Sequence, residues 1–163
     1  MPKPSKPTLI TAIFDLGRDK LAPPFHREAE HYQKYLPAVL GIDLPMVVYT
    51  DKKHAPLVQQ LRQNRPTKIQ LLEPEELASQ EIYKPIQRIR NNPEWLAQAD
   101  WLPESPQSKL PAYNPVVFSK ALWLYQQSND NTFSSTHFYW IDAGLAHTVP
   151  AELLTADSFV RLS

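Results

Sequence analysis

A carboxylate follows an apolar run near the end of the chain. Residues 138–141 are Phe, Tyr, Trp and Ile, between a polar segment and Gly144, and this pattern predicts a short buried strand. Asp142 comes directly after it. In open α/β sheets ligands bind at the carboxyl ends of the strands, so Asp142 is a candidate to meet a metal ion or a nucleotide. The alternative is an aspartate that caps a turn, with Gly144 two residues on.

Two more carboxylates follow apolar, β-rich runs. The run Thr8–Phe14 predicts a first strand and precedes Asp15, and Pro45–Thr50 predicts a second strand that ends at Asp51. If the strands are parallel, these carboxylates lie along one edge of the sheet with Asp142. A turn-capping role remains open for each of them.

Lys120 is a cation within an otherwise apolar helix. Asn114 is a favoured N-cap and Pro115 a favoured first helical residue, so we expect the helix to begin there. The stretch Val116–Tyr125 is apolar almost all round, which predicts a buried helix. On such a rigid element Lys120 can bind an anionic ligand; the alternative is a lysine that simply reaches solvent.

Other catalytic patterns are absent from the sequence. The three glycines, Gly17, Gly41 and Gly144, are too far apart for a glycine-rich phosphate loop. No serine-hydrolase motif is present. The histidines have no metal-ligand spacing, and we interpret His26, His31, His54 and His137 as surface or packing residues. Only His147, five residues after Asp142, is a candidate metal ligand.

The remaining elements alternate between helix and strand. The sequence predicts a helix over Phe25–Leu36 that Pro37 kinks or ends, and a short helix over Pro56–Leu61. It also predicts a strand over Thr67–Leu72, a packed irregular segment with helical pieces over Pro74–Pro111, a helical turn over Pro150–Leu154 and the start of a strand over Ser158–Leu162. This order is typical of an α/β domain with a largely parallel sheet.

The composition narrows the classes of function. The 163 residues fit one domain, which we place at 8–163 after a flexible, proline- and lysine-rich arm at 1–7. With 17 Lys+Arg and 17 Asp+Glu the chain lacks the basic surface that nucleic-acid binding needs. It has 0 Cys, which excludes thiolate catalysis and cysteine-bound zinc. No apolar run is long enough for a transmembrane helix.

Four segments together resemble the bacterial HtrL/YibB family: Thr11–Arg18, Pro45–Asp51, Tyr113–Lys120 and Tyr139–Leu145. The resemblance runs from about residue 8 to residue 150 and is loosest over Pro74–Pro111. That family is associated with lipopolysaccharide and surface-glycan loci and is similar to GT-A glycosyltransferases. It implies a GT-A-like fold with a nucleotide-sugar donor site.

The resemblance also implies roles for individual residues. Phe118, Lys120 and Trp123 match a GT-A helix in which the lysine contacts the sugar nucleotide, and Asp142 matches the first aspartate of an Asp-x-Asp motif that holds Mn²⁺ or Mg²⁺. The first strand and its loop would wrap the nucleoside, and Asp51 would lie near the base. The implied nucleotide-sugar-binding residues are Thr11, Ala12, Asp15, Arg18, Asp51, Asn114, Lys120, Asp142, Ala143 and Gly144.

Two features depart from the family pattern. Gly144 stands where the motif has its second aspartate, and a single carboxylate is a poor site for a hard divalent cation. GT-A enzymes bind the acceptor with residues that follow this motif, and only 19 residues follow Gly144. We therefore expect the donor-binding half of a transferase, truncated at its C-terminus. The unfinished strand at the C-terminus would favour self-association.

The expected function is glycosyl transfer from a nucleotide-diphosphate sugar to a glycan or lipopolysaccharide acceptor. The expected location is the cytoplasm, peripheral to the inner membrane. Two alternatives belong to other classes: a non-catalytic module that binds sugar nucleotides or glycans, and a structural partner domain.

Overall fold

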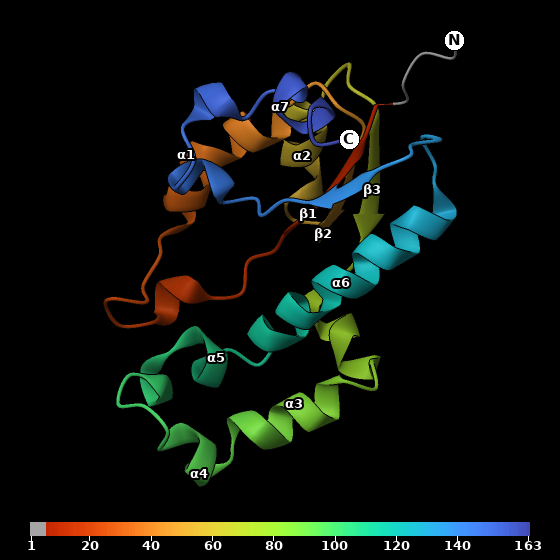
Figure 1. The fold of residues 1–163 in the computed structure, drawn as a ribbon. Helices are drawn as coiled ribbons and strands as arrows, with labels where there is room; N and C mark the ends of the chain where they lie inside the picture. Colours follow the sequence, from red (N-terminus) through yellow and green to blue (C-terminus); the bar gives the residue numbers. More distant parts are fainter. Residues whose placement is uncertain (1–5) are drawn as a thin grey trace.

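One parallel sheet forms the centre of the protein (Figure 1). The computed structural model describes residues 6–163, apart from the side chains of residues 29–32, 78 and 79. Within this part of the chain, β1 (Thr8–Ile13), β2 (Met46–Thr50), β3 (Thr67–Leu71) and β4 (Phe138–Trp140) pair in the order β3-β2-β1-β4, every pair parallel. The predicted α/β class is confirmed, and the three strands expected to share a sheet do so with their carboxyl ends at one edge.

The two central strands are buried on both faces. Nearly every residue of β1 and all of β2 are inaccessible to solvent, which explains why their sequences are continuous apolar runs without polar alternation. The edge strands β3 and β4 are only partly buried, and β3 accordingly mixes Lys68 and Gln70 with apolar residues.

Helices cover both faces of the sheet. They are α1 (Ala29–Leu40), α2 (Ala55–Leu61), α3 (Tyr83–Arg90), α4 (Pro93–Leu96), α5 (Pro106–Lys109), α6 (Tyr113–Asp130) and α7 (Ala156–Val160), with short 3-10 turns η1 (Arg18–Lys20), η2 (Pro74–Ser79), η3 (Leu102–Glu104), η4 (Leu145–His147) and η5 (Ala151–Leu153). Residues of α1, α2 and α7 pack with Leu9 and Ile13 on one face, whereas Val116 and Trp123 of α6 pack with Ile10 on the other. The result is a three-layer arrangement (Figure 1).

The first helix differs from its prediction over Phe25–Leu36. It begins at Ala29, because backbone hydrogen bonds from Phe25 to Ala22 and from Arg27 to Arg18 hold the preceding residues in turns. It also continues through Pro37 to Leu40. The lost backbone hydrogen bond is tolerated because Leu36, Val39 and Leu40 are buried in the core.

Helix α6 differs from its prediction at two points. It begins at Tyr113, so Asn114 is not the N-cap; its side-chain amide donates to the carbonyl of Gln107 instead. The helix is also not buried all round, because an outer helix can bury only the side that faces the sheet. Val117, Phe118, Leu122 and Tyr125 are 41–66% exposed.

The segment 74–112 is packed as expected and connects β3 with α6. Its η2 begins with a capping box between Glu73 and Glu76. Its α3 and α5 are joined to each other through Arg90, which donates to the carbonyl of Ser108, and Gln87 donates to the carbonyl of Pro111 just before α6. These bonds fix the segment beside the amino end of α6 (Figure 1).

The predicted strand over Ser158–Leu162 is wrong. Residues 156–160 form α7, and the Thr155 hydroxyl accepts a hydrogen bond from the Ser158 amide as its N-cap. A short apolar run is compatible with helix or strand, and here the cap decides. The predicted turn over Pro150–Leu154 is present as η5.

One buried arginine fixes the entry to two strands. Arg62 is 2% exposed, and its guanidinium donates to the carbonyls of Leu40, Ile42, Leu44 and Pro66 and to the Thr67 hydroxyl. Burial is the main cause that lowers the pKa of Arg62 to about 10, so the side chain stays charged at neutral pH. The loops before β2 and β3 are thereby held by one side chain.

Two further predictions concern the ends of the chain and membranes. Residues 1–5 of the predicted arm lie outside the described residues, and the carbonyl of Lys6 accepts a hydrogen bond from the Ser135 hydroxyl. Among the helices of residues 6–163, none is both long and apolar enough to cross a membrane.

Candidate functional site

A cavity of about 550 Å³ lies at the carboxyl edge of the sheet. Its lining comes from the ends of β1 and β4, from α1 and α6, and from the start of α2. This is the position where ligands bind in parallel α/β sheets. Most of the predicted site residues line it, namely Ala12, Asp15, Arg18, Lys120, Asp142, Ala143 and Gly144.

Asp142 is held by groups from two elements. Its Oδ1 lies 2.6 Å from Nζ of Lys120 on α6 and accepts a hydrogen bond of 3.0 Å from the indole N–H of Trp140 on β4. Burial raises the pKa of Asp142, but the hydrogen bonds and the charge of Lys120 outweigh it, so the pKa lies below its ordinary value. The carboxylate is therefore ionised at neutral pH.

Lys120 projects from α6 toward the end of β4. Its Nζ also lies 5.5 Å from the centre of the Trp140 ring, where a cation interacts favourably with the aromatic face. The side chain is 31% exposed and so remains accessible from the cavity. Lys120 is thus partly exposed and paired, and binding of an anionic ligand stays a prediction.

Three stacked aromatic rings lie beneath the Lys120–Asp142 pair, on the side of the protein core. Trp140 stacks on Trp123 with ring centres 6.2 Å apart, and Trp123 stacks on Tyr49 at 4.5 Å. Trp123 is 2% exposed, so the layer is part of the core. The indole of Trp140 is thereby fixed in the orientation that lets it donate to Asp142.

Asp15 forms a second ion pair at the cavity. Its Oδ2 lies 2.9 Å from Nζ of Lys53, which follows β2, and its Oδ1 accepts a hydrogen bond from the backbone amide of Gly17. Gly17 has φ 80°, a conformation that favours glycine, and this turn brings its amide back to Asp15. The hydrogen bond from Lys53 is the main cause that lowers the pKa of Asp15.

Asp51 is hydrogen-bonded to a neighbouring histidine, His54. It is 5% exposed, and its Oδ1 accepts a hydrogen bond from the backbone amide of His54 and lies 2.7 Å from Nδ1 of the His54 ring. This is the turn-capping geometry that the sequence left open. His54 itself lines the cavity, whereas Asp51 does not.

Besides Asp51, three predicted residues lie away from the cavity lining. Thr11 is fully buried in β1, and its hydroxyl has no hydrogen-bond partner in the described part of the chain. Asn114 is bound to the Gln107 carbonyl. The ring of His147 packs edge-on against Tyr35, with centres 5.3 Å apart.

The described residues do not form a divalent-cation cage on their own. Nowhere among them do three His, Asp or Glu side chains gather with metal-binding geometry. Both hydrogen bonds to Asp142 go to Oδ1, which leaves Oδ2 as its available oxygen. A hard cation needs about six oxygen ligands, so a metal here would depend on oxygens from a bound ligand.

Sequence reasoning missed Trp140, Lys53 and His54 as parts of the site. Trp140 could have been found, because residues i and i+2 of an extended strand point to the same face and Asp142 is two residues on. Lys53 could not, since its contact with Asp15 depends on the pairing of β1 with β2. His54 was interpreted as a surface or packing histidine because no metal-ligand spacing involves it.

Comparison with known proteins identifies a family for the chain. A family model described as "Bacterial protein of unknown function (HtrL_YibB)" matches residues 5–157. Neither the curated proteins nor the solved structures contain a match to the chain.

Proposed function

The chain belongs to the HtrL_YibB family, and on that premise we propose that it binds a nucleotide-diphosphate sugar in the cavity at the carboxyl edge of its sheet. The observation that carries the proposal is the convergence of Lys120, Asp142 and Asp15 on one cavity from three separate segments of the chain. Its volume, about 550 Å³, lies within the range of small-molecule sites.

The charges of the cavity suit a diphosphate. Arg18, Arg27, Lys53 and Lys120 all line it, and guanidinium and ammonium groups are the usual partners of phosphate oxygens. Asp15 and Asp142 hold two of these cations in place through ion pairs. A diphosphate can therefore enter a set of cations that are already oriented.

Apolar and aromatic groups complete the cavity. Phe14, Tyr113 and Trp140 are part of the lining and offer flat surfaces to a nucleobase or a sugar ring. The backbone at Ala143 and Gly144 is close to the Asp142 carboxylate, and no atom lies within 4 Å of the position that a Cβ at Gly144 would occupy. This open space adjoins the proposed diphosphate position.

Mn²⁺ or Mg²⁺ enters the proposal as a cation shared with the donor. Asp142 would hold it through Oδ2, and the phosphate oxygens of the donor would supply further ligands. A cation so placed would neutralise charge on the leaving diphosphate. The residues of this chain contribute the orientation of that carboxylate through Lys120 and Trp140.

The reaction we propose is glycosyl transfer to a glycan or lipopolysaccharide acceptor. The bond between the anomeric carbon and the diphosphate oxygen breaks, and the nucleoside diphosphate leaves with the electron pair. A bond forms from the anomeric carbon to an acceptor hydroxyl, whose proton passes to solvent or to a basic group. We place this reaction in the cytoplasm, peripheral to the inner membrane, as the family resemblance implies.

A second candidate is a sugar-nucleotide-binding module without catalysis. It is favoured by Gly144, which removes one carboxylate from the Asp-x-Asp pattern, and by the pairing of Asp142 with Lys120 rather than with other carboxylates. Both candidates predict donor binding; only the first predicts transfer.

Calorimetry with UDP and a panel of UDP-sugars in Mn²⁺ tests the shared part of the proposal. Lys120→Ala should weaken binding by about 1–3 kcal/mol, because a charge-assisted contact is lost and Asp142 is left to repel the diphosphate. Lys84→Ala is the matched control, since Lys84 is exposed and lines neither this cavity nor the neighbouring one. Absence of binding for every nucleotide and nucleotide sugar tried would end the proposal.

A transfer assay separates the two candidates. The protein is incubated with labelled UDP-sugars, Mn²⁺ and a lipopolysaccharide core oligosaccharide, and the label in the acceptor is measured. Donor binding without transfer across the acceptor panel favours the module, and transfer that is lost in Asp142→Asn favours the enzyme.

A further inference from the structure

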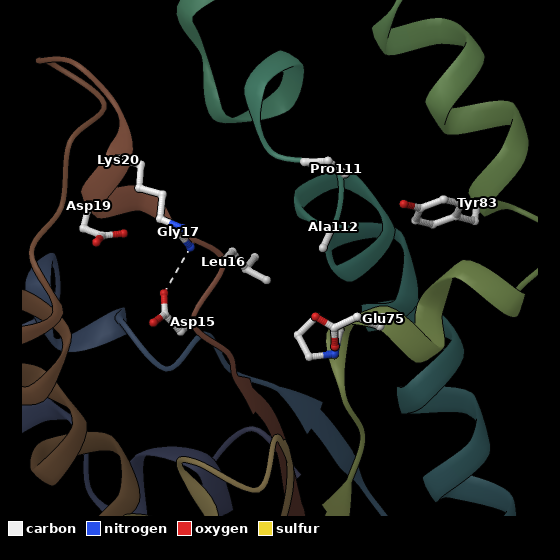
Figure 2. A pocket seen from close by; sticks show the side chains of 10 residues that line it. Asp15, Leu16, Gly17, Asp19, Lys20, Glu75, Tyr83, Pro111 and Ala112 are labelled. Carbon is white, nitrogen blue, oxygen red and sulfur yellow. Dashed lines mark hydrogen bonds between the residues drawn. The ribbon is translucent and has the colours of Figure 1, made fainter.

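A second cavity of about 400 Å³ lies beside the first. Figure 2 shows its two sides: Asp15, Asp19 and Lys20 belong to the loop after β1, and Glu75 and Tyr83 face them from η2 and α3. Asp15, Leu16 and Asp19 line both cavities. The two spaces therefore adjoin along this shared wall.

The balance of charge differs between the two cavities: four cations accompany three carboxylates in the lining of the first, and only one cation accompanies three carboxylates in the second. Asp15, Asp19 and Glu75 line it, with Lys20 as its single cation. Three carboxylates repel a phosphate or an acidic sugar, whereas they accept hydrogen bonds from hydroxyl and ammonium groups. This cavity therefore suits an uncharged or amino-bearing ligand rather than a diphosphate.

Two of its polar groups are not used within the protein. The Glu75 carboxylate and the Tyr83 hydroxyl make no hydrogen bond or ion pair in the described part of the chain. Flat apolar surfaces lie next to them, provided by the Tyr83 ring, Pro74 and Pro111. Hydroxyl donors on one side and a C–H face on the other are the features of a pyranose ring.

We propose that this second cavity binds the acceptor as a neutral or amino saccharide. Its hydroxyl groups donate to Asp15, Asp19 and Glu75, and its apolar face lies against Tyr83. The role as acceptor rests on the proposed function, whereas saccharide binding at this site does not. The shared wall places the saccharide next to the donor cavity, as transfer between two bound reactants requires.

This assignment differs from the expectation drawn from the sequence, which placed the acceptor-binding part after Gly144. The far wall of the cavity is built by residues 74–112 instead. That segment reaches the site because Gln87 and Arg90 fix α3 to the residues just before α6.

Ligand-observed NMR on the whole chain tests the proposal. The probes are methyl glucoside, methyl N-acetylglucosaminide, glucosamine and lactose, with glucose 6-phosphate and N-acetylneuraminic acid as acidic counterparts. We expect binding of at least one neutral or amino sugar and none of the acidic sugars. Glu75→Gln and Tyr83→Ala should each weaken that binding by roughly two- to tenfold, the effect of losing one polar contact, and leave UDP affinity unchanged.

Controls make the outcome specific. Glu81→Gln removes the same charge from an exposed residue outside both cavities and should change nothing. If Tyr83→Ala fails to fold by thermal melting, Tyr83→Phe tests the hydroxyl alone. Unchanged saccharide affinity in the Glu75 and Tyr83 variants, or no binding of any neutral or amino sugar, overturns the site. Saccharide binding that responds to these variants in a protein that binds no nucleotide sugar supports the site and ends the proposed function.

Discussion

Lys120 and Asp142 form the contact on which the proposed donor site depends. Their side chains are 31% and 61% exposed, and ion pairs with such exposure contribute little to folding stability. The pair is nevertheless well defined, since Trp140 donates to the same carboxylate oxygen and lies under the ammonium group. Its role is better explained by the orientation of charge in the cavity than by stability.

Removing the ammonium group should change how Asp142 titrates. In the native protein the pKa of Asp142 is below its ordinary value of 3.8. In Lys120→Met burial and the hydrogen bond from Trp140 remain but the cation is gone, so the pKa of Asp142 should rise. Carboxyl ¹³C NMR across pH 2–6 measures this shift, with Lys84→Met as the control. An Asp142 pKa that stays depressed in Lys120→Met would mean that another group holds the carboxylate.

Gly144 allows a direct test of metal chemistry. Its φ of -89° suits any residue, and a Cβ there would meet no atom within 4 Å, so an aspartate fits without strain. Gly144→Asp should tighten Mn²⁺ binding in the presence of UDP by roughly tenfold or more, because a second carboxylate joins the coordination shell.

Manganese titration by calorimetry or electron paramagnetic resonance measures the effect of this substitution. Gly144→Ala controls for added volume, and Asp142→Asn should remove the metal effect in either background. Equal Mn²⁺ affinity in Gly144→Asp and Gly144→Ala would show that no cation sits beside Asp142.

The helices and loops position these residues through a few specific contacts. α6 buries Val116 and Trp123 against the sheet and carries Lys120 to the end of β4. The loops that lead into β2 and β3 contain buried backbone carbonyls, and Arg62 is the donor to four of them. Arg62 thus fixes the amino edge of the sheet, opposite the edge that carries the cavity.

Arg62→Met should destabilise the protein by roughly 2–4 kcal/mol, because several buried carbonyls lose their donor at once. Arg65→Met is the matched control: Arg65 is partly exposed, donates to one carbonyl at 3.2 Å, and its loss should cost less than about 1 kcal/mol. Urea unfolding followed by circular dichroism measures both. Similar midpoints for the two variants would show that the carbonyls find other partners.

Among the described residues, four ion pairs join segments that are distant in sequence; Lys6 pairs with Asp43 at 3.8 Å, and the other three are closer. Lys53 pairs with Asp15 between the ends of β1 and β2, Lys120 with Asp142 between α6 and the end of β4, and Lys68 with Asp130 between β3 and the end of α6. Each of these three lysines stabilises the ionised form of the carboxylate it pairs with, and the pKa of each of these three aspartates lies below its ordinary value.

Stability should therefore fall in acid. A carboxylate with a lowered folded-state pKa contributes stability that is fully present above its unfolded value of 3.8 and is lost as the pH falls through the folded-state pKa. The urea midpoint should decline below about pH 4.

The triple variant Asp15→Asn, Asp130→Asn, Asp142→Asn isolates these three carboxylates. It should show a smaller decline than the native protein, and 1 M NaCl should reduce the difference because the aspartates are 45–61% exposed. If the urea midpoint declined with falling pH equally in the native protein and the triple variant, the three pairs would have no stabilising role.

Self-association was expected because an unfinished C-terminal strand would be exposed. Residues 156–160 are helical, so this reason no longer applies. Self-association stays a prediction, which light scattering of the purified chain can check.

The sequence alone determined the class of fold and the edge of the sheet at which the candidate site lies. Buried parallel strands need apolar residues on both faces, so β1 and β2 were recognisable as continuous apolar runs. A carboxylate after each strand then pointed to one edge of the sheet, since parallel strands end on the same side. These are local patterns, which neighbouring residues can specify.

Only the tertiary structure decided which polar groups meet. The pairing of Asp15 with Lys53 depends on strand register, and the position of Lys120 depends on how α6 lies across the sheet. The exposed side of α6 was missed because an apolar run does not show which of its sides the rest of the protein will cover. The C-terminal helix was missed because a short apolar run is compatible with either helix or strand. The second cavity required residues 15–20 and 74–112 to come together, and such a contact depends on packing that no single segment of the sequence contains.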